Sequence, residues 1–164
     1  MWDEECDVGG FDLAKFLPYR ISVAAARVSR GFAKRYRTEF GISIPEWRVL
    51  AHLSAAGGPV SVREVHARVD MDKSKVSRAA ARLEQAGYVA KAENSDDRRL
   101  VQLTLTEAGR DLVARIVPVA RSYHAELLAR LGPEADSFRR ALERLATEEE
   151  EDRLPEKEAF VHDD

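Results

Sequence analysis

Closely spaced helix starts are the feature that most constrains how this chain can fold. Ser43 is followed three residues later by Glu46, and Ser61 is followed in the same way by Glu64. Each pair has the pattern of a capping box, in which the hydroxyl accepts from the first turn and the carboxylate accepts from the cap amide. Asp72 is a favourable N-cap for a further helix. The central part of the chain is therefore predicted to contain three short helices in succession.

Turn-forming residues set the ends of these helices. The first helix is predicted to end at about Ala56, because residues 57–59 are Gly-Gly-Pro. The second helix is short and carries its apolar side chains on one inner side: Val62, Val65 and Val69. Residues 70–72 then form a tight turn, and the third helix stops at Gly87. This pattern indicates a helix-turn-helix.

A hairpin is predicted after the third helix, and long helices flank the central part. Residues 88–92 and 100–105 favour strands, because apolar and polar side chains alternate in the second of them and turn residues lie between. Before the central part, residues 18–40 carry apolar side chains at helical steps. After it, Thr106 can cap a long helix, residues 107–131, which is expected to be bent or interrupted at its proline, Pro118. A final helix is predicted from the following Gly-Pro pair.

Composition excludes several classes of protein. The chain has 164 residues, which suits one domain, and its 45% hydrophobic and 34% charged content is ordinary for a globular protein. No apolar run approaches the roughly 18 residues that a membrane span needs, and the N-terminus lacks the basic start of a signal peptide. We therefore expect a cytoplasmic protein with no membrane partner. A single cysteine, Cys6, fits a reducing compartment.

The net charge of −3 conceals an uneven distribution. Residues 148–164 carry nine acids and two bases, a net charge of −7, which leaves +4 on residues 1–147. We interpret the acidic segment as a solvated, flexible tail and assign it no function. Within residues 61–106 the bases gather in two short stretches, so local charge is more informative than the isoelectric point.

The third helix has one apolar face and one basic, hydroxyl-bearing face. Its inner positions are Val76, Ala80 and Leu83, and the opposite face carries Ser74, Ser77, Arg78 and Arg82. In its first turn Lys73, Ser74, Lys75 and Ser77 offer donors that can reach base edges or phosphates in a major groove. A solvated polar face is the alternative interpretation of this helix taken alone.

The loop of the hairpin is also charged. Asp96, Asp97, Arg98 and Arg99 follow one another there, and an arginine on a tight turn can enter the narrow, electronegative minor groove. Asp97 would orient Arg99 or close the turn. The alternative is an ordinary surface ion pair. A helix for one groove beside a charged loop for the next favours the interpretation as a reader of duplex DNA.

These segments resemble the MarR family of bacterial transcription regulators, from about Phe16 to Thr147. Residues 97–106, DRRLVQLTLT, match the family's D-x-R-x-x-x-L-x-L-T pattern at every fixed position, and Glu-Ala-Gly follows, as in many members. Residues 71–78, MDKSKVSR, and residues 83–89, LEQAGYV, look like the family's recognition helix and its exit into the wing.

The resemblance implies a fold and a set of DNA-binding residues. The expected fold is mainly α with a small β-hairpin wing (α+β), a winged helix-turn-helix with N- and C-terminal dimerisation helices. One MarR-type domain would span residues 1–164, with dimerisation helices at 11–40 and 107–147, a DNA-binding region at 43–106 and the acidic tail at 148–164. The candidate DNA-binding residues are Ser61, Arg63, Lys73, Ser74, Lys75, Ser77, Arg78, Arg82, Asp97, Arg98 and Arg99.

The resemblance also implies an obligate homodimer, most simply a repressor, on double-stranded DNA. The distribution of apolar residues agrees with a dimer, because the terminal helices carry more apolar surface than a small monomer could easily bury. These side chains are Leu13, Phe16, Leu17, Ile116, Leu127, Leu128, Leu131, Phe138 and Leu142. For any one of them alone, core packing is the simpler interpretation. Two-fold symmetry predicts an inverted-repeat, pseudo-palindromic operator with half-site centres roughly 10 to 10.5 base pairs apart.

Family members commonly bind a small aromatic or phenolic acid and then lose affinity for DNA. Tyr19, Arg20 and Trp47 are the candidates for such an effector site, because they offer aromatic walls and a cation for a carboxylate. The alternatives are that Trp47 is plain core and that Arg20 forms an interface ion pair.

Other functions have less support in the sequence. A thiol-based sensor through Cys6 is disfavoured, because Glu4, Glu5 and Asp7 oppose a thiolate there. The four histidines lack metal-ligand spacing, so no metal or other cofactor is expected. The chain has no nucleophile motif or phosphate loop of an enzyme. A winged helix that contacts only proteins, without a ligand response, remains the alternative to a DNA reader.

Overall fold

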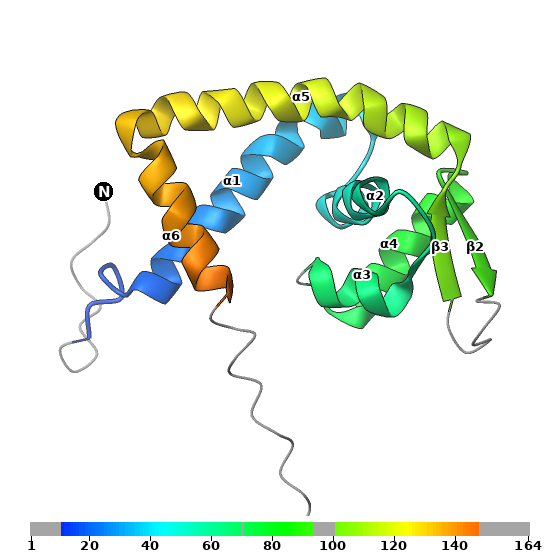
Figure 1. Ribbon diagram of the computed structural model, residues 1–164, viewed down its shortest axis with the longest axis horizontal. Helices are drawn as coiled ribbons and strands as arrows, with labels where there is room; N and C mark the ends of the chain where they lie inside the picture. The colour runs from blue at the N-terminus through cyan, green and yellow to red at the C-terminus, as the bar shows by residue number, and fades with distance from the viewer. Residues whose placement is uncertain (1–10, 70, 94–100, 148–164) are drawn as a thin grey trace, which may run out of the picture. The chain divides into compact units, whose positions relative to one another are not determined.

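The computed structural model describes residues 11–69, 71–93 and 101–147 (Figure 1). The chain divides into two compact units, one that runs up to Tyr123 and one that begins at His124. No helix within the described ranges is both long and apolar enough to span a membrane.

The fold is mainly helical with one small antiparallel sheet, as expected. Its elements, in chain order, are α1 (Leu17–Phe40), α2 (Ile44–Ala56), β1 (Val60–Ser61), α3 (Val62–Arg68), α4 (Lys73–Gln85), β2 (Val89–Glu93), β3 (Val101–Leu105), α5 (Glu107–Leu131), the 3₁₀ turn η1 (Gly132–Glu134) and α6 (Ala135–Thr147). In Figure 1 the helices α2, α3 and α4 cluster beside the strands.

The capping boxes predicted from the sequence are present. The Ser43 hydroxyl accepts from the Glu46 amide at 3.4 Å, and the Glu46 carboxylate accepts from the Ser43 amide at 2.7 Å. Ser61 and Glu64 repeat this arrangement at 3.1 Å and 2.9 Å. Gly57 ends α2 in the left-handed conformation, which a glycine adopts without the steric cost of a Cβ. Local sequence therefore sets where α2 and α3 begin.

The sheet is larger than the hairpin that the sequence predicts. Its strand order is β1-β3-β2, with Val60 opposite Leu103 and Val89 opposite Leu105 in antiparallel register. Strand β1 has only two residues, Val60 and Ser61, which is too short to produce a readable alternation. The extra strand joins the start of α3 to the strand that leads out of the wing.

Of the two outcomes expected at Pro118, a bend or an interruption, the interruption does not occur, because helix α5 continues through the proline. Proline removes one hydrogen bond and crowds the preceding turn, but tertiary packing can hold such a helix together. Leu112, Val113 and Ile116 of the preceding two turns are buried and anchor it. At the other end of α5, a 3₁₀ turn precedes α6 in place of a direct helix start at Gly132.

One apolar core holds the first unit together. Its fully buried large side chains come from α1, α2, α3, α4, β3 and α5: Tyr36, Val49, Leu50, Val65, Val76, Leu83, Leu103 and Ile116. The core fixes α4 against α2, α3 and the sheet. In the second unit, α6 is amphipathic and leaves Phe138, Leu142 and Leu145 exposed in the single chain.

Candidate nucleic-acid interface

Helix α4 buries one face and exposes a row of donors on the other. Val76 and Ala80 are 0% exposed and Leu83 is 1% exposed, as the sequence predicts for its inner face. The side chains predicted to face outward are exposed: Lys73, Ser74, Lys75, Ser77, Arg78 and Arg82. Because the core fixes the inner face, these donors project from a rigid support.

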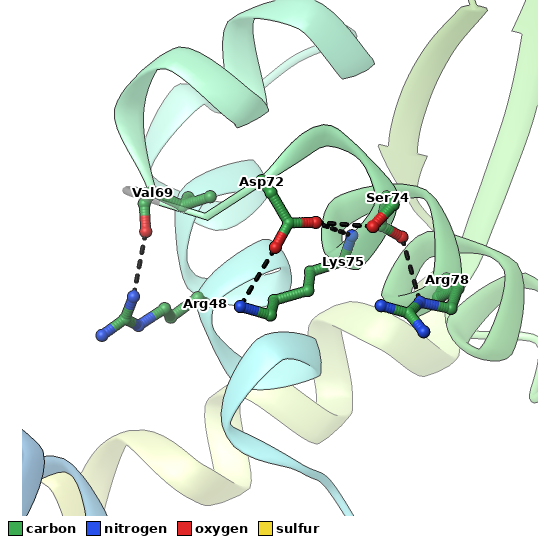
Figure 2. A network of polar contacts seen from close by, with 6 residues as sticks. All are labelled: Arg48, Val69, Asp72, Ser74, Lys75 and Arg78. Carbon is green, nitrogen blue, oxygen red and sulfur yellow. Dashed lines mark hydrogen bonds and ion pairs between the residues drawn. The ribbon is translucent and has the colours of Figure 1, made fainter.

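The first turn of α4 is organised around Asp72 (Figure 2). Its Oδ1 accepts from the Lys75 backbone amide at 2.8 Å and from the Ser74 hydroxyl at 2.6 Å. Its Oδ2 lies 3.0 Å from Lys75 Nζ. The hydrogen bond from Ser74, then those from Lys75, hold the pKa of the Asp72 carboxyl well below its usual value. The N-cap role of Asp72 follows from the sequence, whereas its ion pair with Lys75 was not anticipated.

Further contacts orient the same end of the helix. Arg78 Nε donates to the Ser74 carbonyl at 3.3 Å, which directs the arginine along α4. Arg48 of α2 donates through Nη1 to the carbonyl of Val69, the C-cap of α3, at 3.1 Å (Figure 2). The role of Arg48 could not be predicted from the sequence, because this contact joins residues 21 positions apart and no local pattern marks it.

Strands β2 and β3 support the wing, and polar contacts join them to the neighbouring helices. Lys91 Nζ on β2 lies 2.6 Å from the Glu84 carboxylate on α4. Thr106 donates through Oγ1 to the Gly87 carbonyl at 2.6 Å and accepts from the Gly109 amide at 3.0 Å, which confirms its predicted cap of α5. The wing-tip candidates Asp97, Arg98 and Arg99 lie outside the described residues.

Two candidates at the start of α3, the N-cap Ser61 and Arg63, differ in accessibility. Arg63 is exposed, whereas Ser61 is only 8% exposed and donates from its hydroxyl to the Glu64 carboxylate at 2.9 Å. Ser61 is thus placed to fix the start of α3, whereas the Arg63 side chain is accessible to solvent.

The candidate effector residues fall into two groups. Trp47 packs in an aromatic cluster, with its ring centroid 5.5 Å from that of Phe32 and 5.9 Å from that of Tyr36. Tyr19 and Arg20 are exposed in the first turn of α1. Tyr19 precedes Phe32 by about 20 Å of helix at roughly 1.5 Å per residue. Within one chain, the structure therefore does not bring Tyr19 and Arg20 to Trp47.

Alternative chemistries find no site in the part of the chain that the structure describes. No group of three His, Cys, Asp or Glu side chains within residues 11–69, 71–93 and 101–147 could hold a metal ion. Cys6, the candidate redox thiol, lies outside these ranges, as does the acidic segment 148–164.

A helix-turn-helix whose second helix exposes a basic face, followed at once by a two-stranded wing, defines the winged helix-turn-helix class. Comparison with known proteins agrees. A sequence profile of the MarR family matches residues 40–100. The HTH-type transcriptional repressor Rv2887 of Mycobacterium tuberculosis is 31% identical over 134 residues, which cover 81% of this chain and 93% of the relative.

Solved structures show the same fold. A MarR/EmrR family transcriptional regulator from Acinetobacter sp. ADP1 superposes with a TM-score of 0.76 at 26% identity, over 86% of this chain and 99% of the other. BpsR of Bordetella bronchiseptica superposes with a TM-score of 0.72 at 24% identity, over 85% and 98% of the two chains. The chain belongs to the MarR family and is a transcriptional regulator, not an enzyme.

Proposed function

We propose that this regulator is a homodimeric repressor that binds an inverted-repeat operator. Each α4 would enter a major groove, and Arg99 of each wing would enter the adjacent minor groove. In this proposal residues 43–106 form the DNA-binding region, and residues 11–40 and 107–147 supply the dimerisation helices of a single domain.

The outer face of α4 is the observation that carries the proposal. The exposed hydroxyls and cations from Lys73 to Arg82 lie opposite buried Val76 and Leu83, so the helix can present donors to bases and phosphates without disturbing the core. A module that contacts only proteins has no need for this concentration of donors at the positive end of a helix.

Exposed apolar side chains support the dimer. On either side of the central region, Phe16, Leu17, Phe138, Leu142 and Leu145 are each 42% to 60% exposed in the single chain. Burial of such side chains stabilises a dimer by roughly 25 cal/mol for each Å² of apolar surface removed from water. Sedimentation should give a dimer for the wild type and a monomer for Leu142→Glu, whereas a monomeric wild type would refute this part.

A fluorescence anisotropy titration tests DNA binding. The wild type should bind random duplex DNA weakly at low salt and lose affinity steeply as salt rises, because each neutralised phosphate releases counterions. On a duplex selected from a random library, Arg99→Ala should cost about 1 to 3 kcal/mol and leave the dimer intact. Ser77→Ala should change sequence preference more than general affinity.

The two possible failures of this titration have different meanings. If the wild type binds no duplex at low salt, the protein-contact alternative replaces the proposed function. If it binds but Arg99→Ala has wild-type affinity for the selected duplex, α4 remains the reader and the wing assignment is wrong.

A small aromatic acid is the proposed effector, and the chain's own part of the site would include Trp47. In the related fold of BpsR, 6-hydroxynicotinic acid regulates DNA binding. Here the Trp47 cluster continues through Phe32 to Tyr123 of α5, with ring centroids 5.6 Å apart, and the Arg35 guanidinium lies 5.7 Å from the Tyr123 ring centroid. Tyr19 and Arg20 would reach the same ligand only from the other subunit of the dimer.

Calorimetry with 6-hydroxynicotinate and other aromatic carboxylic acids tests this effector. A ligand that relieves repression must bind the DNA-free protein more tightly than the DNA-bound protein. Saturating DNA should therefore weaken ligand binding by the same factor by which the saturating ligand weakens DNA binding. Trp47→Ala should abolish ligand binding while the protein still binds DNA. Tyr19→Ala and Arg20→Ala should weaken it only in the dimer, and unchanged affinity in both would remove them from the site.

A further inference from the structure

The carboxylate of Asp72 engages two of the groups proposed to reach DNA. Lys75 Nζ lies 3.0 Å from Oδ2, and the Ser74 hydroxyl donates to Oδ1 at 2.6 Å (Figure 2). The Lys75 amide also donates to Oδ1 at 2.8 Å. Two hydrogen bonds thus hold the carboxylate still while it faces the lysine ammonium.

We propose that Asp72 is a specificity-determining residue that lowers the affinity of the reading helix for DNA of any sequence. The inference rests on the proposed function, because it concerns the same face of α4. Asp72 neutralises Lys75 in the free protein and adds a negative charge where phosphates would approach. Sequence-independent binding depends on the number of phosphates neutralised, so this pairing reduces it more than it reduces contacts to base edges.

The geometry of the pair makes it exchangeable. The side chains of Lys75 and Asp72 are 57% and 51% exposed, and ion pairs in water are weak. A correctly placed phosphate or base edge can therefore replace the carboxylate as the partner of Lys75. On random DNA, where other contacts are few, nothing compensates for the lost pair or for the repulsion between Asp72 and the phosphates.

Asp72 also has a structural role, which a test must keep separate. The carboxylate caps α4, and a negative charge at a helix N-terminus is favourable. Asparagine is as good an N-cap as aspartate but carries no charge. Asp72→Asn therefore removes the charge and keeps the cap, and a circular dichroism melt checks that the helix content is retained.

Anisotropy titrations on two duplexes test the inference. One probe is a mixture of random sequence, and the other is a duplex selected from that mixture with the wild-type protein. We expect Asp72→Asn to bind the random probe about threefold more tightly at 50 mM salt, with the salt slope steeper by about one for each α4 of the proposed dimer. The ratio of selected to random affinity should fall.

Asp12→Asn is the matched control for charge. Asp12 forms the same i,i+3 pair, with Lys15 at 2.9 Å, and accepts from the Ala14 amide at 2.9 Å, but it precedes α1 and lies outside the DNA-binding region. This variant should leave the ratio of affinities unchanged. An equal effect of Asp12→Asn would reduce the role of Asp72 to net charge and overturn the inference.

A double-variant cycle supplies an independent readout. In a Lys75→Gln background, Asp72→Asn should increase random-DNA affinity less than in the wild type, because the paired ammonium is gone. If Asp72→Asn does not fold, Asp72→Ser replaces it, since serine is also an uncharged N-cap. A wild type that binds DNA while the uncharged variant shows an unchanged ratio and slope would overturn the inference and leave the proposed function standing.

Discussion

Gly109 of α5 lies directly against the backbone of Tyr88. A Cβ on Gly109 would collide with the Tyr88 carbonyl oxygen, which also accepts from the Thr106 amide at 3.1 Å. A backbone carbonyl cannot turn away as a side chain can. Packing against Tyr88 therefore explains why glycine stands at the end of the Glu-Ala-Gly sequence that follows the wing, a sequence that resembles the MarR family.

Gly109→Ala should destabilise the protein. Alanine in a helix is worth up to about 1 kcal/mol over glycine, but the collision with backbone should cost about 1 to 3 kcal/mol, so the loss is expected to prevail. Urea unfolding followed by circular dichroism measures the difference. Gly58→Ala is the control, because nothing lies within 4 Å of its added Cβ. A stabilised Gly109→Ala would show that α5 can shift freely.

Ionisation of the Tyr36 phenol is expected to make the free energy of unfolding depend on pH in the alkaline range. The side chain is 1% exposed, and burial raises its pKa to about 12. An unfolded tyrosine has a pKa of about 10. Because the folded value is the higher one, the contribution to stability is complete below pH 10 and is lost as the pH rises toward 12.

Tyr36→Phe should remove this alkaline loss. The unfolding free energy of the wild type should decrease between pH 10 and the highest accessible pH, and that of the variant should decrease less. Urea titrations at several pH values measure the slope. Parallel curves for the two proteins would mean that Tyr36 ionises without unfolding the chain.

Helix α5 contains an internal proline, Pro118, which weakens the backbone hydrogen bonding of the helix. Pro118 cannot donate to the carbonyl of Ala114 one turn earlier, so α5 lacks one backbone hydrogen bond on a side where both residues are exposed. Pro118→Ala should therefore stabilise the protein by about 1 to 3 kcal/mol in urea unfolding. Pro133→Ala at the start of η1 should give no such gain, since a first turn needs no donor there.

The helix starts could be predicted and the contacts between elements could not. Ser43, Ser61 and Asp72 act on amides within three residues, so their roles can be recognised from spacing alone. Strand β1 is defined by the pairing of Val60 with Leu103, which lie far apart in the sequence. The Glu84–Lys91 and Arg48–Val69 contacts likewise join residues of different elements. The sequence predicted a bend or an interruption at Pro118, and α5 is not interrupted there, because packing overrides propensity.

The candidate DNA-binding face was easier to predict than the candidate effector site. The donors of α4 share one helix, so a helical period of 3.6 residues places them on one side. Trp47 acquires its neighbours Phe32, Tyr36 and Tyr123 from two other helices, and no period in the sequence brings them together. A site built across elements has no local pattern.

Charge is divided unevenly along the chain. Residues 148–164 carry −7 and the rest of the chain carries +4, so the sequence as a whole is acidic while the outer face of α4 carries cations. Like charges repel over a Debye length, which is about 30 Å at 0.01 M salt and about 8 Å at 0.15 M. The acidic segment should therefore slow the approach to DNA most strongly at low salt.

Deletion of residues 148–164 should raise the association rate with random duplex DNA at 10 mM salt, and the gain should vanish near 150 mM. Stopped-flow anisotropy of the full chain and the shortened chain at both salt concentrations measures it. A full-length variant with the nine acids of that segment changed to their amides separates charge from length, and it should associate as fast as the shortened chain. If this variant instead matches the wild type, the segment acts through its bulk, and the long-range electrostatic account of this regulator fails.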